Sequence, residues 1–391
     1  MTCEFEMNLP YTLVSGANKV DLVGQKAKEL GNKALLIMDP FFKDGPVAKR
    51  VLDSLSAAGV AVEEFYDVVP NPRNTTIDRA CEIARNTKCE VVIAVGGGST
   101  IDTAKAVAFV AYHGGECWDY VERLDGDVKR PSEPGLPLIA VATTAGTGSE
   151  VTPYSVINNT SIREKCSISN PAIYAKVVIL DPVLMANMPR KVTALTGIDA
   201  FSHCFESYMH TGSTLWSEML SIQGMKLFAE NIRECCFNGQ NLEARTQMAW
   251  ANTLGGMAIA ISGCTVPHAI GQPVGAMTDA AHGATLVACY PAVLRWTIPI
   301  AEEKFAVAAE ILDPSVKNLS TREKAEKLPD ICEKLFEELI GEKLTLGGFG
   351  LKEEEIEPLA DLIFKSYTWN LEFHPKVPNK EELINLIKAS M

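Results

Sequence analysis

The chain is long, acidic and rich in apolar residues, and these properties exclude several classes of protein. It has 391 residues, of which 47% are hydrophobic and 22% charged, and its formal net charge is −13. This composition is typical of a globular protein and excludes extended disorder. The acidic balance and the lack of a Lys/Arg run argue against nucleic acid, because phosphate binding needs clustered basic side chains. We expect two domains and a small-molecule partner.

The sequence carries no signal for secretion or membrane insertion. The N-terminus, MTCEFEMNLPYTL, has no basic segment followed by an apolar one, and no apolar run reaches the roughly 18 residues of a membrane span. We therefore expect a cytoplasmic protein that does not bind membranes. The eleven cysteines include no CxxC pair, so we interpret them as reduced core residues and not as disulfides or zinc ligands.

Short β-branched apolar runs alternate with helical segments in the first half of the chain. The runs span 33–39, 90–99, 136–144 and 176–182. Segments such as VAKRVLDSLSAAG separate them, which is the pattern of buried parallel strands in an α/β layer. We predict an α/β domain over residues 1–187.

After Pro189 the apolar residues follow a 3.6-residue period without strand-like alternation. The amphipathic segments span 193–209, 215–236, 244–262, 322–340 and 380–390. This periodicity predicts an all-helical second domain over residues 188–391.

A first glycine loop, Gly96–Ser99, ends the apolar run at 90–99 and precedes the helical segment IDTAKAVAFVAY. Glycine lets the backbone approach a pyrophosphate, and the N–H groups at a helix start attract the anion. Ser99 and Asp102 have the spacing of a capping box. A turn of this kind equally fits a tight connection with no ligand.

A second glycine loop, Thr143–Glu150, follows the run at 136–144. Two such loops at the carboxyl edge of a parallel sheet indicate a dinucleotide, so we interpret the first domain as Rossmann-like and dinucleotide-binding. Asp39 ends the run at 33–39, where a carboxylate can accept hydrogen bonds from both adenosine ribose hydroxyls and repel a 2′-phosphate. This favours NAD over NADP, unless Asp39 only caps the turn before Pro40.

Asp199 and His203 stand four residues apart in the helical segment GIDAFSHCFESY, so they share one helix face. Alone, such a pair also fits a surface contact. Phe201 and Phe205 make the segment apolar, however, and a buried carboxylate beside an imidazole needs a compensating partner such as a cation.

His268 and His282 bracket the segment HAIGQPVGAMTDAAH, whose glycines and Pro273 predict a loop between two helices. Each histidine alone also fits a hydrogen-bonded polar residue of the core. One carboxylate with three imidazoles suits Fe²⁺, Zn²⁺, Mn²⁺ or Co²⁺ and disfavours Ca²⁺ and Mg²⁺.

The motifs together resemble those of a known family. They are GGGSTIDTAK, TTAGTGSEVT, ILDPVLMANMP, GIDAFSHCFESY and VPHAIGQPVGAMTDAAHG, and they extend over nearly the whole chain. The chain resembles the iron-containing, group III alcohol dehydrogenases, which include lactaldehyde reductase and the 1,3-propanediol and butanol dehydrogenases.

The resemblance implies a site for NAD(H) and one for a divalent ion. It implies phosphate and ribose contacts for Gly97, Gly98, Ser99 and Asp102, nicotinamide contacts for Thr143, Thr144 and Thr147, and a ribose contact for Lys165. It also assigns Asp199, His203, His268 and His282 as ligands of Fe²⁺ or Zn²⁺, or else Mn²⁺. A homodimer or larger homo-oligomer is a further implication.

Two positions depart from the family pattern. Gln272 stands where many relatives have a second histidine, and Ile259 replaces a residue that is aromatic in the lactaldehyde reductase branch. An amide cannot exchange a proton as histidine does, so we expect Gln272 to hold a polar or anionic substituent of a small aldehyde. With Gln272, we predict His268 and His282 as the catalytic residues.

The sequence therefore predicts a metal-dependent, NAD(H)-linked alcohol dehydrogenase or aldehyde reductase. Within the same family, a glycerol-type, diol-type or simple alkyl alcohol dehydrogenase is the alternative. A lyase resembling dehydroquinate synthase and a non-catalytic metal- or nucleotide-binding protein are more distant ones.

Overall fold

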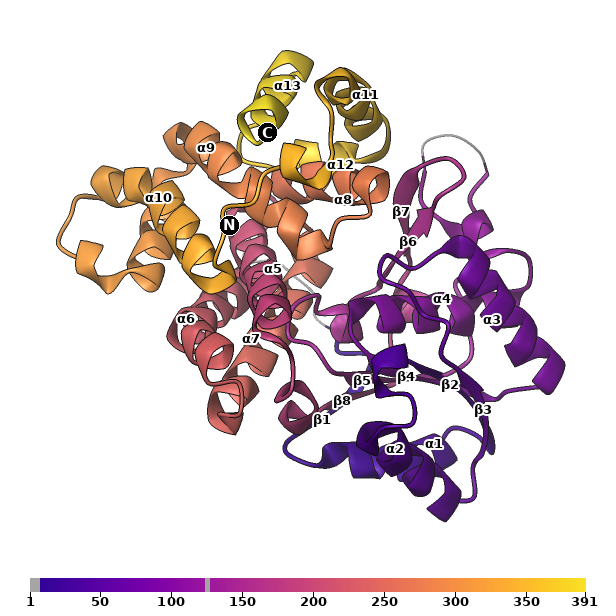
Figure 1. Ribbon diagram of the computed structural model, residues 1–391. Coiled ribbons are helices and arrows are strands. Elements are labelled where there is room, and N and C mark those ends of the chain that lie inside the picture. The colour runs from indigo at the N-terminus through magenta and orange to yellow at the C-terminus, as the bar shows by residue number, and fades with distance from the viewer. Residues whose placement is uncertain (1–7, 124–126) are drawn as a thin grey trace. The chain divides into compact units, whose positions relative to one another are not determined.

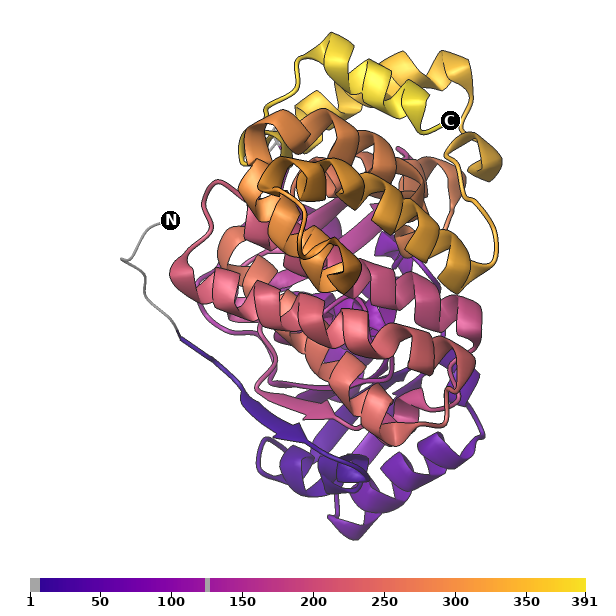
Figure 2. The same ribbon diagram turned by 90° about the vertical axis from the view of Figure 1, so that its left-hand side faces the viewer.

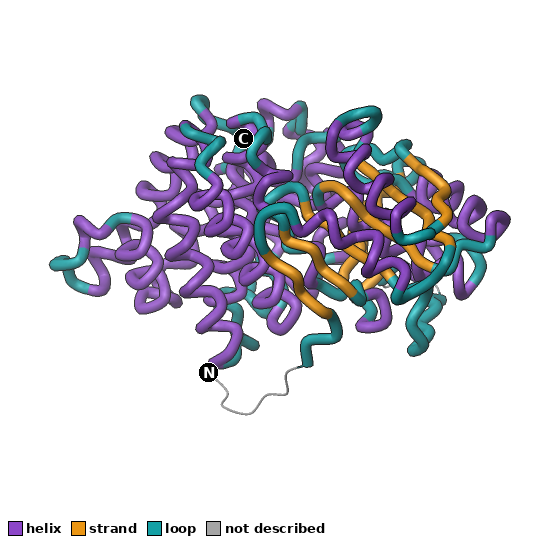
Figure 3. The backbone as a smooth tube through the Cα atoms, turned by 90° about the horizontal axis from the view of Figure 1, so that it is seen from below, coloured by secondary structure: helices purple, strands orange, loops and turns teal. Residues whose placement is uncertain are grey.

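The computed structural model describes residues 8–123 and 127–391 (Figure 1). This part of the chain forms two compact units, which divide between Asn187 and Met188. The first unit combines strands with helices and the second is helical. Figure 3 shows the same contrast, with every described strand in the first unit. The predicted fold class is confirmed.

Six parallel strands form the sheet of the first unit, in the order β1-β8-β5-β4-β2-β3. They are β1 (Thr12–Ser15), β2 (Lys33–Met38), β3 (Ala61–Phe65), β4 (Val91–Gly96), β5 (Leu138–Ala142) and β8 (Val177–Leu180). The four predicted runs correspond to β2, β4, β5 and β8, the inner strands of the sheet. Their β-branched residues are buried because helices cover both faces.

Alternate side chains of the inner strands face opposite helices. On one face, Leu36 and Ile93 pack with Val51 of α2 (Pro46–Ala57) in one buried cluster that also includes α1 (Val23–Lys28). On the other side of the sheet lie α3 (Asn74–Thr87) and α4 (Gly98–His113), as Figure 1 shows. Burial on both faces explains why these strands are continuous apolar runs.

Two edge strands and a hairpin were not predicted from the sequence. β1 has four residues, none of them fully buried, and β3 exposes Glu64, so neither carries the apolar signal of an inner strand. The antiparallel pair β6 (Tyr154–Asn159) and β7 (Glu164–Ser169) forms a separate two-stranded sheet. Polar residues dominate this hairpin, which hid it from a search for apolar runs.

The second unit consists of nine α-helices among the residues described. They are α5 (Arg190–Met209), α6 (Leu215–Phe237), α7 (Leu242–Ser262), α8 (Val266–Thr278), α9 (His282–Leu312), α10 (Thr321–Ile340), α11 (Ile356–Ser366), α12 (Thr368–Glu372) and α13 (Lys380–Ala389). Figure 2 shows the last of them, drawn in yellow, at one end of this unit. All five amphipathic segments predicted as helices are helical.

Aromatic packing places α5 at the centre of this unit. Phe201 and Phe205 are fully buried, and their ring centroids lie 5.1 Å from Phe228 of α6 and 5.3 Å from Phe305 of α9, respectively. The polar residues on the same helix are therefore surrounded by an apolar core.

The loop predicted between His268 and His282 is mostly helix. Pro273 lies inside α8, and only residues 279–281 separate α8 from α9. Val266, Ile270 and Val274 repeat at four-residue spacing and are fully buried, so their packing outweighs the hydrogen bond that Pro273 cannot donate. The prediction was wrong because it weighted proline and glycine above this periodicity.

Helix α9 is apolar but belongs to the core. It is the one helix in the described part of the chain that is long and apolar enough to cross a membrane, and α7 with α8 qualifies only as a pair bent by 104°. Tyr290, Val293 and Leu294 of α9 are fully buried, and α9 packs closely on α10. Its apolar character is explained by packing within the protein.

Asp181, which directly follows β8, forms hydrogen bonds with the turn that follows β1. Its side chain is fully buried and accepts hydrogen bonds from the backbone N–H groups of Asn18 at 3.0 Å, Val20 at 3.1 Å and Val183 at 3.1 Å. One carboxylate therefore holds the turn after β1 and caps the turn after β8.

We predict that Asp181→Ala lowers the free energy of unfolding by about 2–4 kcal/mol, because three backbone donors lose their acceptor. The measurement is urea unfolding followed by circular dichroism. Asp21→Ala is the control, since it removes only an exposed ion pair with Arg50 and should cost less than about 1 kcal/mol. Equal losses in the two variants would contradict this role.

Candidate metal centre and cofactor loops

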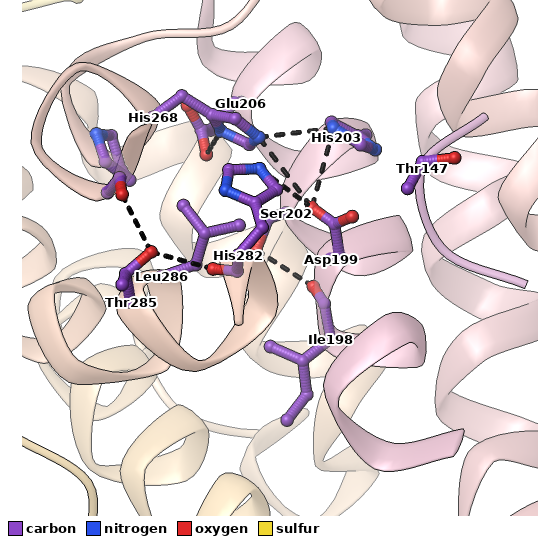
Figure 4. Close-up of polar contacts among 12 residues, drawn as sticks. Thr147, Ile198, Asp199, Ser202, His203, Glu206, His268, His282, Thr285 and Leu286 are labelled. Carbon is purple, nitrogen blue, oxygen red and sulfur yellow. Dashed lines mark hydrogen bonds and ion pairs between the residues drawn. The ribbon is translucent and has the colours of Figure 1, made fainter. Parts of the chain in front are cut away.

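The structure gathers the four predicted metal ligands in the helical unit. We call this set the Asp–His cluster: Asp199 and His203 from α5, His268 from α8 and His282 from the start of α9. Asp199 Oδ1 lies 3.6 Å from His203 Nε2, 3.8 Å from His268 Nε2 and 3.7 Å from His282 Nε2. Figure 4 shows the imidazoles converging on the carboxylate.

Helix geometry explains how these side chains come together. Asp199 and His203 are one turn apart on α5 and point to the same side. Thr285, in the first turn of α9, has its hydroxyl 2.9 Å from the carbonyl of Gly271 in α8 and 2.8 Å from that of His282. This contact joins α8 to the start of α9 and so fixes where His282 begins its helix.

The residues present fit a divalent cation. Asp199 Oδ1 is buried and has no hydrogen bond with any described residue. Burial raises the pKa of Asp199, but His203, His282 and His268 outweigh it and hold the pKa well below its usual range. A buried ionised carboxylate without a hydrogen bond on one oxygen is costly, and a cation removes that cost.

Glu206, which was not predicted as a site residue, sets the orientation of His268. Its carboxylate is fully buried, with Oε1 2.7 Å from His268 Nδ1 and Oε2 accepting from the N–H of Thr265 at 2.7 Å. Because Nδ1–H donates to this carboxylate, Nε2 of a neutral His268 presents its lone pair toward Asp199. The signal was present, since Glu206 lies three residues after His203 on the same face of α5.

The two glycine loops pack against each other at one edge of the sheet. Gly96 of β4 pairs with Ala142 of β5, so the chain leaves both strands side by side. A Cβ atom on Gly98 would lie 2.4 Å from Thr147 Cγ2, and one on Gly97 would lie 3.1 Å from Thr144 Oγ1. The close packing of the two loops is therefore sufficient to require glycine at position 98, without any contact to a ligand.

The predicted capping box between Ser99 and Asp102 is wrong. Helix α4 begins at Gly98 with Gly97 as its N-cap, so Ser99 lies inside the first turn. Asp102 is buried, and its carboxylate instead accepts from the hydroxyl of Ser149 at 2.5 Å and the N–H of Val156 at 3.1 Å. In this structure Asp102 holds the segment after β5.

Lys105, one turn further along α4, holds the same segment. Its ammonium is fully buried and donates to the carbonyls of Thr152 and Tyr154, each at 2.8 Å. Burial lowers the pKa of Lys105 to about 8, although Asp102 and Glu150 oppose this shift. The sequence signal that was not used is a lysine directly before the apolar run AVAFV in the same helix.

Asp39 and Lys165 make defined contacts inside the first unit. Asp39 caps the short 3₁₀ helix Pro40–Phe42 by accepting from the N–H of Phe41 at 2.9 Å, which is the capping contact considered as its alternative role. Lys165 of β7 is buried and donates to Asn71 Oδ1 at 2.8 Å. The capping contact occupies one Asp39 oxygen and leaves its second oxygen for other partners.

The two positions that depart from the family pattern lie on neighbouring helices. Gln272 is half-buried on α8, one turn after His268, and Ile259 is buried on α7. Gln272 is therefore attached to the same rigid helix as a member of the Asp–His cluster.

Cys264 departs from the expectation that the cysteines are core residues. The ten cysteines in residues 8–123 and 127–391 are free thiols, and all except Cys264 are buried. Cys264 is half-buried in the bend between α7 and α8, and its Sγ lies within 4.8 Å of ligand atoms of both His203 and His268. Nothing in its sequence spacing indicated this position.

Comparison with known proteins covers both units. Residues 10–182 match the family profile described as iron-containing alcohol dehydrogenase, and residues 193–391 match the C-terminal profile of the same family. The chain is 32% identical over 384 residues to an NAD-dependent methanol dehydrogenase of Bacillus methanolicus, which covers 98% of this chain and 99% of the relative. It is 30% identical over 381 residues to a sulfoacetaldehyde reductase of Bilophila wadsworthia, covering 97% of each.

A solved structure shows the same likeness. The archaeal halo-thermophilic alcohol dehydrogenase ADH/D1 from a Red Sea brine pool superimposes with a TM-score of 0.95 at 31% identity, covering 100% of both chains. Because both family profiles match and together span nearly the whole chain, the resemblance inferred from the motifs is confirmed. The chain belongs to the iron-containing alcohol dehydrogenase family and is an oxidoreductase of that family.

Proposed function

We propose that the protein is a metal-dependent, NAD(H)-linked alcohol dehydrogenase or aldehyde reductase that binds one divalent cation in the Asp–His cluster. The observation that carries the proposal is the buried Asp199 Oδ1, which faces three imidazoles and has no hydrogen bond within the described residues. The donor set favours Fe²⁺, Zn²⁺ or Mn²⁺.

Asp199 and Glu206 have different roles in binding the cation. Asp199 supplies the negative charge, and Glu206 directs the Nε2 lone pair of His268 toward the ion. When bound, the cation supplies Lewis-acid polarisation of the alcohol or aldehyde oxygen, and NAD(H) supplies or accepts the hydride. His282 and His268 would act as catalytic residues because they would bind the cation that contacts the substrate oxygen.

The α/β unit, residues 1–187, binds NAD(H) in this proposal. The N-terminus of α4 and the first glycine loop hold phosphate through Gly97, Gly98 and Ser99. The second glycine loop contacts the nicotinamide through Thr143, Thr144 and Thr147, and Lys165 contacts a ribose. Asp39 accepts from the adenosine ribose with its second oxygen, and Asp102 acts by holding the loop at Ser149. The NAD dependence of the methanol dehydrogenase relative supports the choice of NAD.

The helical unit, residues 188–391, binds the metal and a small substrate. We propose a polar or anionic aldehyde, because Gln272 offers an amide one turn from His268 and a related enzyme reduces sulfoacetaldehyde. A simple small alcohol is the second candidate, since another relative of similar identity acts on methanol. A cytoplasmic homodimer or larger assembly stays a prediction from the family resemblance.

We predict that exhaustive chelation lowers turnover of NADH with small aldehydes at least ~100-fold, because the substrate oxygen loses its Lewis acid. Fe²⁺, Zn²⁺ or Mn²⁺ should restore it, and NADH should be preferred to NADPH. The measurement is NADH oxidation with butanal and with hydroxyl-, carboxyl- or sulfo-substituted aldehydes. Full activity in the metal-free protein would rule out the proposed mechanism.

Glu206→Gln should weaken metal binding about 10- to 100-fold, because the single amide oxygen can accept from the N–H of Thr265 or from Nδ1–H of His268 but not from both, and its NH2 group then faces the other donor. The dissociation constant is measured for Mn²⁺ by competition with a chelator. Glu234→Gln, on the exposed side of α6, is the control and should leave the constant unchanged. An unchanged constant in Glu206→Gln would show that Glu206 does not orient the ligand.

Gln272→Ala should lower kcat/KM for hydroxyl-, carboxyl- or sulfo-substituted aldehydes at least ~10-fold, because a lost hydrogen bond to a charged or polar group costs this much. The value for butanal should change less than about two-fold. The test is to measure kcat/KM for both substrate classes with the wild type and with the variant. Equal losses for all substrates, or a wild-type preference for butanal, would rule out recognition by Gln272.

A further inference from the structure

The bend between α7 and α8 holds Cys264 beside the Asp–His cluster. Gly263 has a φ of +91°, in the region that favours glycine, and its N–H donates to the carbonyl of Ile259. Thr265, on the other side of Cys264, is bound by Glu206, and the carbonyl of Cys264 accepts from Asn370 at 3.0 Å. The backbone is therefore held on both sides of Cys264 by contacts that do not involve the thiol.

The thiol faces two of the three imidazoles of the cluster. The ligand atoms of His203, Cys264 and His268 all lie within 4.8 Å of one another, as do those of Asp199, His268 and His282. Tetrahedral zinc with bonds of about 2.0–2.3 Å spaces its ligand atoms about 3.5 Å apart. His203 and His268 already have their Nε2 atoms 3.2 Å apart, so the thiol is the ligand that has to move closer, by no more than roughly 1.3 Å from the 4.8 Å limit to reach this spacing.

We propose that Cys264, His203 and His268 form a second ligand set, which shares two imidazoles with the Asp–His cluster and binds thiophilic divalent cations such as Cd²⁺. The inference rests on the proposed metal site, because both sets use His203 and His268. It concerns which ions the protein retains and does not concern the alcohol substrate.

Ligand chemistry separates the two sets. Thiolate is a soft ligand that favours Cd²⁺ and Zn²⁺, whereas a carboxylate favours harder ions such as Mn²⁺. On coordination the Cys264 thiol releases its proton to solvent and its sulfur binds the cation, so no redox partner is needed. His282 and Asp199 belong to the other ligand set, so a thiophilic cation held by Cys264 would not need either of them as a ligand.

Replacing sulfur by oxygen at this one position tests the proposal. Cys264→Ser keeps the backbone contacts to Asn370 and changes only the donor atom. Cys89→Ser is the matched control, because Cys89 is a free thiol in the α/β unit. Metal-free wild type and both variants are titrated with Cd²⁺ and with Mn²⁺, and the near-ultraviolet thiolate-to-cadmium charge-transfer band is recorded.

We expect Cys264→Ser to raise the dissociation constant of Cd²⁺ at least ~10-fold and to abolish the charge-transfer band, because the soft donor is lost. Its Mn²⁺ constant should change less than about two-fold, which also shows that the variant folds. Cys89→Ser should change neither constant.

The outcomes separate this proposal from the proposed function. The second ligand set is wrong if Mn²⁺ binds normally and Cd²⁺ binds without a charge-transfer band. It is also wrong if the dissociation constant of Cd²⁺ is unchanged in Cys264→Ser. Either result leaves the proposed metal site in the Asp–His cluster unaffected. If the wild type binds neither ion, the second set and the proposed metal site fail together.

Discussion

The structure of the helical unit depends on one constraint, a buried carboxylate that must keep its charge. Asp199 is buried on α5, and its pKa stays low because the three imidazoles outweigh the effect of burial. Helices α5, α8 and α9 must each deliver a histidine to one point. The Thr285 contact between α8 and α9 helps to hold His268 and His282 at this point.

Buried polar groups organise the α/β unit in a comparable way. Asp102 and Lys105 project from one helix and bind the segment that follows β5, Asp102 at Ser149 and Val156 and Lys105 at Thr152 and Tyr154 between them. Gly98 removes the one side chain that would separate the two glycine loops. In both units, buried hydrogen bonds inside the same unit hold residues beside those that would touch a ligand.

Periodic patterns made most of the fold predictable from sequence. The inner strands β2, β4, β5 and β8 follow from continuous β-branched apolar runs, and the helix pair Asp199–His203 follows from the 3.6-residue period. Edge strands carry no such signal, and helix α8 was hidden by its proline. Glu206 and Lys105 each had a local signal that was not used, whereas the importance of Cys264 comes from neighbours that are distant in sequence, so only tertiary structure reveals it.

The central claim is that the Asp–His cluster binds a catalytic cation. The most direct test is a crystal structure of the protein loaded with Mn²⁺, with anomalous difference density measured near the manganese absorption edge. The account predicts one strong peak at coordination distance from the carboxylate of Asp199 and from Nε2 of all three histidines. A fully loaded crystal whose manganese peak lies elsewhere, with Asp199 still facing the imidazoles directly, would contradict it.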